Sequence, residues 1–185
     1  MVNLVRLQGQ RYLVDVGFGG PGPCRPIPLT DASDTPGIGV QTIKVSQQTL
    51  DQHSDQDQKA WVYSHRESDE ANWVDGYTFT EVEFFPFDFE VMNLATMTLR
   101  QSFFVQTLLC VRVILDEKTG DPVGQLILMN GELKKKVLGK YELLETFQAE
   151  EERIAGLKKW FGIEISDEDQ KGIVDLPTEL KGWKT

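Results

Sequence analysis

The sequence contains few of the residues from which disulfide frameworks and metal sites are built. Among its 185 residues there are two cysteines and two histidines. Cys24 and Cys110 lie far apart, and neither His53 nor His65 has a histidine or cysteine at the spacing of a zinc site. We therefore expect no disulfide framework and no bound metal, and a reducing, cytoplasmic compartment.

Long apolar runs and an excess of positive charge are also missing. No stretch approaches the roughly 18 apolar residues of a membrane-spanning helix, and the first residues lack the basic and then apolar pattern of a secretory signal. The formal net charge is −10, whereas nucleic-acid binding requires a basic surface. These absences predict a protein that binds neither a membrane nor a nucleic acid.

Short β-strands are predicted for the first half of the chain. Two apolar runs surround Gln8-Gly9-Gln10, which is typical of a β-hairpin. Four prolines between residues 20 and 29 predict a loop, and the polar segment 47–59 predicts a second, exposed loop. The expected strands are 2–7, 11–16, 41–46, 61–65 and 76–80.

Helices are predicted only in the second half. We expect a helix over 86–95 with Asp88 as its N-cap, antiparallel strands over 103–138 that turn at Asn130-Gly131, and an amphipathic helix over 146–161. The order of strands and helices is that of an α+β fold rather than an alternating βαβ fold. The chain then divides into a β-rich part, 1–85, a mixed part, 86–165, and a polar tail, 166–185.

Asp15 is the residue of the first half that most requires an explanation. It follows an apolar strand, and a buried carboxylate without a partner costs several kcal/mol. Either it accepts backbone N–H groups of the glycine turn that follows, or it orients a histidine as the third member of a nucleophilic triad. Phe18, between Gly17 and Gly19, is either the wall of a pocket or a plug of the core.

A dinucleotide-binding turn is excluded at this place. Residues 17–22 match the pattern G-x-G-x-x-G, but that turn must open a helix. The prolines that follow are incompatible with one. The two histidines are best explained as a solvated loop residue, His53, and a strand-end residue, His65.

Five segments in order resemble the arylamine N-acetyltransferase family. The first, Tyr-Leu-Val-Asp-Val-Gly-Phe-Gly-Gly at 12–20, is similar to the motif that carries the family's triad aspartate. The others are 26–29, 88–93, 126–136 and 150–163, and the polar loop and the Glu-rich helix are most similar to the fungal branch. The resemblance implies an antiparallel β-barrel portion followed by an α/β lid, without the family's N-terminal helical bundle.

The resemblance also implies a reaction. Members of the family transfer an acetyl group from acetyl-CoA to an aromatic amine or hydrazine through a Cys–His–Asp triad, a ping-pong reaction used in xenobiotic detoxification. Asp15 would then be catalytic and orient the imidazole. Gly17, Phe18 and Gly19 would border the amine pocket. Thr98 and Ser102 would contact CoA, although the segment 98–104 lacks the proline of the family pattern.

Two members of the implied triad have no counterpart in this sequence. The family's R-G-G-x-C motif is not matched, Cys24 is not that cysteine, and the family's histidine would fall immediately before Met1. We therefore expect an N-terminally truncated fragment that is inactive alone. Two alternatives are a non-catalytic remnant that binds CoA or an arylamine, and an N-malonyltransferase in which Arg25 or Arg100 pairs with the malonyl carboxylate.

Overall fold

The computed structural model describes residues 1–182, which form two compact units. Unit 1 comprises Met1–Glu83, Leu115–Gly124 and Val137–Gly139, and unit 2 comprises Phe84–Ile114, Gln125–Lys136 and the chain from Lys140 onward. Most strands are antiparallel and helices are few, so the predicted α+β class is confirmed. The last residues of the predicted tail, 183–185, lie outside the described residues.

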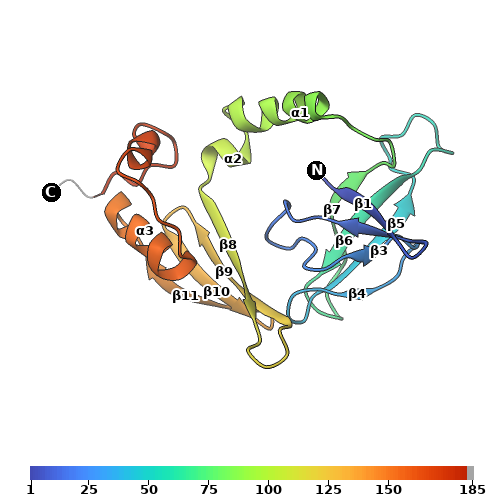
Figure 1. Cartoon of the computed structure of the whole chain (residues 1–185), viewed down its shortest axis with the longest axis horizontal. Helices are drawn as coiled ribbons and strands as arrows, with labels where there is room; N and C mark the ends of the chain where they lie inside the picture. Colours follow the sequence, from blue (N-terminus) through green and yellow to red (C-terminus); the bar gives the residue numbers. More distant parts are fainter. Residues whose placement is uncertain (183–185) are drawn as a thin grey trace. The chain divides into compact units, whose positions relative to one another are not determined.

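Unit 1 holds two antiparallel sheets (Figure 1). The first has the order β1-β2-β3, and its strands are β1 Asn3–Leu7, β2 Gln10–Val14 and β3 Ile27–Pro28. The second has the order β4-β5-β6-β7, and its strands are β4 Thr35–Pro36, β5 Thr42–Gln48, β6 Ala60–Arg66 and β7 Val74–Phe79.

The hairpin predicted around Gly9 is confirmed, with a shorter loop. Leu7 pairs with Gln10, which leaves only Gln8 and Gly9 in the turn. Both residues have positive φ, 50° and 84°. This is the geometry of the two-residue turns whose twist matches that of the flanking strands, and the glycine adopts it without steric cost.

A single core joins the two sheets of unit 1. β5 alternates buried and partly exposed residues along most of its length, and the first six residues of β6, which lies between β5 and β7, are buried. The buried residues of β6 include the polar Ser64 and His65 as well as apolar ones, because β6 pairs with a strand on each side. The core residues are Leu13, Ile27, Leu29, Ile43, Val45, Trp61 and Tyr63.

Unit 2 carries most of a four-stranded sheet with the order β11-β10-β9-β8. Its strands are β8 Leu109–Leu115, β9 Pro122–Met129, β10 Glu132–Val137 and β11 Lys140–Thr146. The expectation of strand from residue 103 was wrong, because the short helix α2, Phe103–Gln106, occupies this position. The fourth strand, β11, was also missed. Its turn begins at Leu138 with φ 48°, a conformation that leucine rarely adopts.

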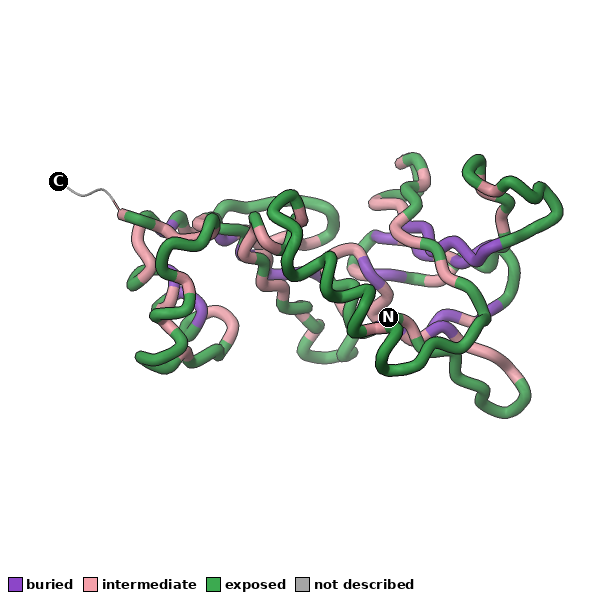
Figure 2. The backbone as a smooth tube through the Cα atoms, turned by 90° about the horizontal axis from the view of Figure 1, so that it is seen from above, coloured by how far each residue is buried: buried purple, intermediate pink, exposed green. Residues whose placement is uncertain are grey.

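Helix α1 spans Pro86–Thr98, longer at its C-terminal end than predicted. Pro86 fits the first helical position because its missing N–H would have no intrahelical partner. Asp88 is not the N-cap but the third helical residue, and its carboxylate accepts the Phe85 N–H at 2.8 Å. None of the residues of α1 is buried (Figure 2). No helix within residues 1–182 has the length and apolarity needed to cross a membrane.

Helix α3, Glu150–Gly156, continues into the π-helical turn η1, Leu157–Phe161. The predicted start at residue 146 was too early, because Thr146 ends β11 and the Phe147 N–H donates to the Gly131 carbonyl at 2.7 Å. Gly162 ends the helix in the left-handed conformation, with φ 70°, which confirms the expected glycine at the helix end. The tail contains the 3₁₀ turn η2, Asp169–Ile173. The buried core of unit 2 is Leu128, Leu133, Phe147 and Leu157.

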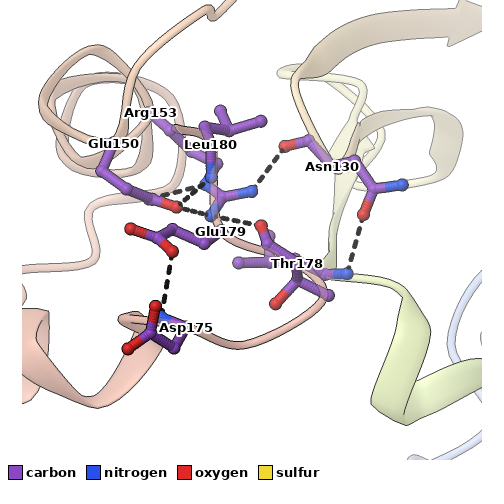
Figure 3. A network of polar contacts seen from close by, with 8 residues as sticks. Asn130, Glu150, Arg153, Asp175, Thr178, Glu179 and Leu180 are labelled. Atoms are coloured by element: carbon purple, nitrogen blue, oxygen red, sulfur yellow. Dashed lines mark hydrogen bonds and ion pairs between the residues drawn. The ribbon is translucent and has the colours of Figure 1, made fainter. Parts of the chain in front are cut away.

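Arg153 of α3 is a buried charge at the centre of a polar network in unit 2 (Figure 3). It forms an ion pair with Glu150 and donates to the carbonyl oxygens of Asn130, at 3.2 Å, and Thr178, at 3.0 Å. The Glu150 carboxylate also accepts the Leu180 N–H at 2.8 Å. The Arg153–Glu150 pair therefore links the β9–β10 turn and the C-terminal segment to helix α3 through hydrogen bonds to their backbones.

Candidate functional site

The Asp15 side chain lies at the end of β2 and is 7% exposed. Its Oδ1 accepts the Gly17 N–H at 2.8 Å and the Phe18 N–H at 3.1 Å. The interpretation of Asp15 as a cap of the glycine turn is therefore confirmed. Both backbone amides use the same carboxylate oxygen, so a role for the second oxygen remains compatible with this geometry.

Tyr77 of β7 is a neighbour of Asp15 that the sequence alone did not reveal. Burial of the phenol, and after it the interaction with the Asp15 carboxylate, raise the pKa of Tyr77 well above its ordinary value. The hydroxyl is shielded from solvent and makes no hydrogen bond of normal geometry within residues 1–182. Tyr77 is therefore a protonated phenol beside a carboxylate, with an O–H available for donation.

The Phe18 ring packs on two tyrosines. Its centroid lies 4.9 Å from that of Tyr77 and 6.3 Å from that of Tyr63, and the two tyrosine rings stack at 5.0 Å. We call Phe18, Tyr63 and Tyr77 the aromatic cluster. Phe18 nevertheless remains 41% exposed. One part of the ring contributes to packing and the other is accessible, so Phe18 is not a plug of the core, and its role as the wall of a pocket stays a prediction.

The glycine turn is shaped by Gly19 and Gly22. Gly19 has φ 67°, and its carbonyl oxygen accepts the Gly22 N–H at 2.7 Å. A Cβ atom at Gly22 would lie 2.8 Å from that oxygen and 3.1 Å from the Phe18 ring, so a larger residue would push against both. Gly17 contributes its N–H to Asp15. No helix follows the turn, which confirms the exclusion of a dinucleotide-binding motif.

The proline-rich loop after the turn is fastened to the second sheet of unit 1. The Tyr63 hydroxyl donates to the Pro21 carbonyl at 2.6 Å, and the Gln41 amide donates to the same oxygen at 3.3 Å. Burial raises the pKa of Tyr63, with smaller contributions from Cys24 and Asp15. Cys24 and Asp15 therefore both lie within electrostatic range of the Tyr63 phenol.

The two histidines occupy different environments. His65 is buried near the end of β6, where its ring stacks on Tyr63 at 6.3 Å and its Nδ1 lies 3.6 Å from a Glu67 oxygen. The ring of His53 caps a turn of the polar loop, within 3.1 Å of the Gln58 carbonyl. Within residues 1–182 no three Cys, His, Asp or Glu side chains are grouped as metal ligands would be. The expected absence of a metal stays a prediction.

Thr98 and Ser102, the expected CoA contacts, lie in unit 2, Thr98 at the end of α1 and Ser102 at the start of α2. The Thr98 hydroxyl donates to the Leu94 carbonyl at 2.5 Å, and the Ser102 hydroxyl donates to the Thr96 carbonyl at 2.5 Å. Both hydroxyls thus bond the backbone of the same helix end, and their oxygens can still accept hydrogen bonds. Contact with CoA stays a prediction for both residues.

Tyr63 and Tyr77 left a signal in the sequence. Aromatic residues alternate along β6, at Trp61, Tyr63 and His65, and along β7, at Tyr77 and Phe79. Alternation predicts a common face of a strand. Only the pairing of Tyr63 with Tyr77 across β6 and β7 shows that these faces coincide.

This motif geometry can be compared with known proteins. The sequence profile of the N-acetyltransferase family matches residues 1–170. The chain belongs to the arylamine N-acetyltransferase family. The residues that carried the sequence resemblance, including Asp15 and Phe18, lie within the matched range.

The curated relatives of this family member are fungal enzymes. The chain is 32% identical over 190 residues to N-malonyltransferase FDB2 of Fusarium pseudograminearum, a match that covers 98% of this chain and 54% of the relative. It is 31% identical over 188 residues to N-malonyltransferase FDB2 of Gibberella moniliformis, with the same coverage. The chain therefore spans about half the length of the curated relatives it matches.

Solved structures of the family have the same fold. The arylamine N-acetyltransferase of Mycobacterium abscessus aligns with a TM-score of 0.75 at 22% identity, covering 92% of this chain and 56% of its own. The arylamine N-acetyltransferase of Salmonella typhimurium aligns with a TM-score of 0.71 at 22% identity, and the match covers 90% of this chain and 54% of that enzyme. The arylamine N-acetyltransferase of Mycobacterium marinum in complex with CoA aligns with a TM-score of 0.68 at 24% identity, and the match covers 88% of this chain and 53% of that enzyme.

Proposed function

We propose that this chain serves acyl transfer from an acyl-CoA to an aromatic amine in the cytoplasm, with Asp15 as the carboxylate that orients a catalytic imidazole. The observation that carries the proposal is the environment of Asp15. It is a buried carboxylate with both backbone amides on one oxygen and a protonated phenol nearby. A group that only capped the turn would not require burial among aromatic residues.

The chemistry follows the logic of a Cys–His–Asp triad. A thiolate attacks the thioester carbonyl of the acyl-CoA, the bond to the CoA sulfur breaks, and CoA leaves as a thiol with the proton held by the imidazole. The amine then attacks the enzyme thioester and gives up a proton as the enzyme sulfur leaves. Asp15 would hold the imidazole in the tautomer that accepts the thiol proton and would stabilise the imidazolium.

Tyr77 would assist Asp15 in this arrangement. Its O–H would donate to the nearby Asp15 carboxylate, and a donor on one oxygen would fix the direction of the other. Gly17, Phe18 and Gly19 would border the amine, because the ring of Phe18 is partly exposed beside the turn. Thr98 and Ser102 would contact CoA through their hydroxyl oxygens.

The nucleophile and the base are not assigned to this chain. Cys24 lies in a proline-rich loop outside the family's R-G-G-x-C motif. We therefore propose that residues 1–185 are inactive alone and contribute the orienting carboxylate and the substrate walls to a larger enzyme.

Reconstitution tests this proposal. Purified 1–185, incubated with acetyl-CoA or malonyl-CoA and an aniline, is expected to release no CoA thiol above the buffer rate. Mixing it with the separately expressed part of the Fusarium pseudograminearum relative that this chain does not match is expected to restore transfer. In that mixture Asp15→Asn should lower the rate by about 10³- to 10⁴-fold, as removal of a triad carboxylate does.

The control is Asp51→Asn, because Asp51 is an exposed carboxylate of the polar loop. It should leave the rate unchanged. Turnover by 1–185 alone would show that the chain holds its own nucleophile and base. A stable mixture without transfer, or transfer that is insensitive to Asp15→Asn, would refute the role of Asp15.

A second candidate donor has a specific observation in its favour. The curated relatives at 31% and 32% identity are N-malonyltransferases, whereas the structures named N-acetyltransferases are below 25% identical. We therefore expect the reconstituted mixture to prefer malonyl-CoA over acetyl-CoA. Equal or greater rates with acetyl-CoA would restore acetyl-CoA as the donor.

A further inference from the structure

We infer that Arg25 recognises the free carboxylate of a malonyl donor; the inference rests on the proposed acyl-CoA function. Malonyl-CoA and acetyl-CoA differ by one carboxylate at the end of the acyl group. A cation close to the reacting thioester can discriminate between the two donors, because only malonyl-CoA offers it a carboxylate. Arginine suits this task because its planar guanidinium donates two parallel N–H bonds to a carboxylate.

The position of Arg25 follows from the loop that carries it. This loop begins at the glycine turn of Asp15 and is tied to β6 through the Tyr63 bond to Pro21. Cys24, the residue before Arg25, lies within electrostatic range of the Tyr63 phenol. Arg25 therefore directly follows a residue within electrostatic range of Tyr63, a member of the aromatic cluster, on the loop that continues from the turn of Asp15.

The donors of Arg25 are largely unused within residues 1–182. Its Nε is shielded from solvent and has no hydrogen-bond partner. Its ion pair is a single contact of 4.0 Å to a carboxylate oxygen of Asp121, whose side chain is 67% exposed. An exposed pair at that distance contributes little. The Arg25 side chain is itself 37% exposed, so a ligand carboxylate can replace Asp121.

Three other cations of unit 1 are already engaged. Arg11 forms an ion pair with Glu81, which also accepts the Trp61 N–H. The Lys44 ammonium lies 3.9 Å from the centre of the Trp73 ring. Arg66 bonds the side chain and the carbonyl of Asp69.

The remaining cations of unit 1 lie on other features. Arg6 is on the exposed strand β1, opposite Arg11. Lys59 lines a separate cavity of about 450 Å³ bordered by Trp61, Phe79 and Glu81. Lys118 lies in the β8–β9 turn, where its backbone N–H donates to the Asp116 carboxylate. Among the cations of unit 1, Arg25 is therefore the one that lies on the loop of the glycine turn and has N–H donors without a hydrogen-bond partner in the described part of the chain.

Calorimetric titration of the full chain tests the inference. Wild-type 1–185 is titrated with malonyl-CoA, acetyl-CoA and CoA, and the same is done for Arg25→Gln and Arg25→Lys. We expect wild type to bind malonyl-CoA about tenfold more tightly than acetyl-CoA, the size of one charge-assisted hydrogen-bond pair at a half-exposed site. Arg25→Gln should remove this preference and leave acetyl-CoA binding within about twofold, and Arg25→Lys should retain part of it.

Arg6→Gln is the matched control, because it removes the same charge from the same unit at an exposed strand position. Equal loss in Arg6→Gln and Arg25→Gln would show a general effect of charge and overturn the inference. Binding of both donors with equal affinity, unaffected by Arg25→Gln, would overturn it and leave acyl-CoA binding intact. Absence of binding of all three CoA compounds would overturn the inference, and transfer by the reconstituted mixture would then decide the proposed function separately.

Discussion

Asp15 in unit 1 and Arg153 in unit 2 are both buried charges, and their hydrogen bonds differ. The Arg153 side chain, 1% exposed, donates to Glu150 and to two backbone carbonyls from distant parts of the chain. Asp15 uses one oxygen for two amides of its own turn. Arg153 is satisfied by partners that tertiary structure brings to it, whereas Asp15 accepts two amides of its own turn on one oxygen and has the Tyr77 phenol nearby.

This difference separates a structural charge from a candidate functional one. A buried ion whose donors are all engaged is costly to break and has nothing left for a ligand. A buried carboxylate with a spare oxygen keeps part of its interaction capacity for a group that arrives later.

The largest effect is expected for Arg153→Ala. The substitution leaves the partly buried Glu150 carboxylate without its cation and removes the bonds to Asn130 and Thr178. Breaking a buried pair on one side costs about 3–5 kcal/mol of unfolding free energy. Urea unfolding followed by tryptophan fluorescence measures it. Arg153→Lys, which keeps the charge, should lose less, and a loss below about 1 kcal/mol for Arg153→Ala would show that the network contributes little.

A smaller stability loss is expected for Asp15→Asn. An amide oxygen in the same position still accepts the Gly17 and Phe18 N–H groups, and only the charge assistance of those bonds is lost. We expect a decrease of about 1 kcal/mol in unfolding free energy, measured as for Arg153. A loss as large as that of Arg153→Ala would place Asp15 among the structural charges and remove the contrast.

The smallest stability effect is expected for Tyr77→Phe. The hydroxyl has no hydrogen bond of normal geometry, and removing it leaves the stacking on Tyr63 and Phe18 unchanged. We expect unfolding free energy to change by less than about 0.5 kcal/mol. The rate of the reconstituted mixture should nevertheless fall, because we propose that the Tyr77 O–H donates to Asp15 in the assembled site. A stability loss with an unchanged rate would assign Tyr77 to packing.

Much of the local structure could be predicted because its causes are local. The hairpin at Gly9 and the turn at Asn130 follow from residues that adopt positive φ at little cost. The turn at Leu138 and Gly139 was missed because leucine gives no such signal. Residues 103–106 look like strand because they are apolar and aromatic, and such short runs do not distinguish a strand from a helix.

The residues of the candidate site also differ in whether short-range or long-range contacts place them. Asp15, Gly17, Phe18 and Gly19 were found from one motif, and the hydrogen bonds of Asp15 to its own turn are short-range contacts. Tyr77 is 62 residues further along the chain than Asp15, by subtraction of their numbers. No spacing rule links two such positions, because their proximity depends on how two sheets pack on a common core.

By itself the sequence determined the family, the α+β class and the carboxylate at the end of an apolar strand, because motifs, periodicity and turn residues act over a few residues. Only the tertiary structure decided that Tyr63 and Tyr77 lie near Phe18 and Asp15. It also decided that Arg25 has N–H donors without a partner among residues 1–182, and that Arg153 joins a turn, a helix and the C-terminal segment. These contacts depend on strand register and core packing, which join residues that are remote in the sequence.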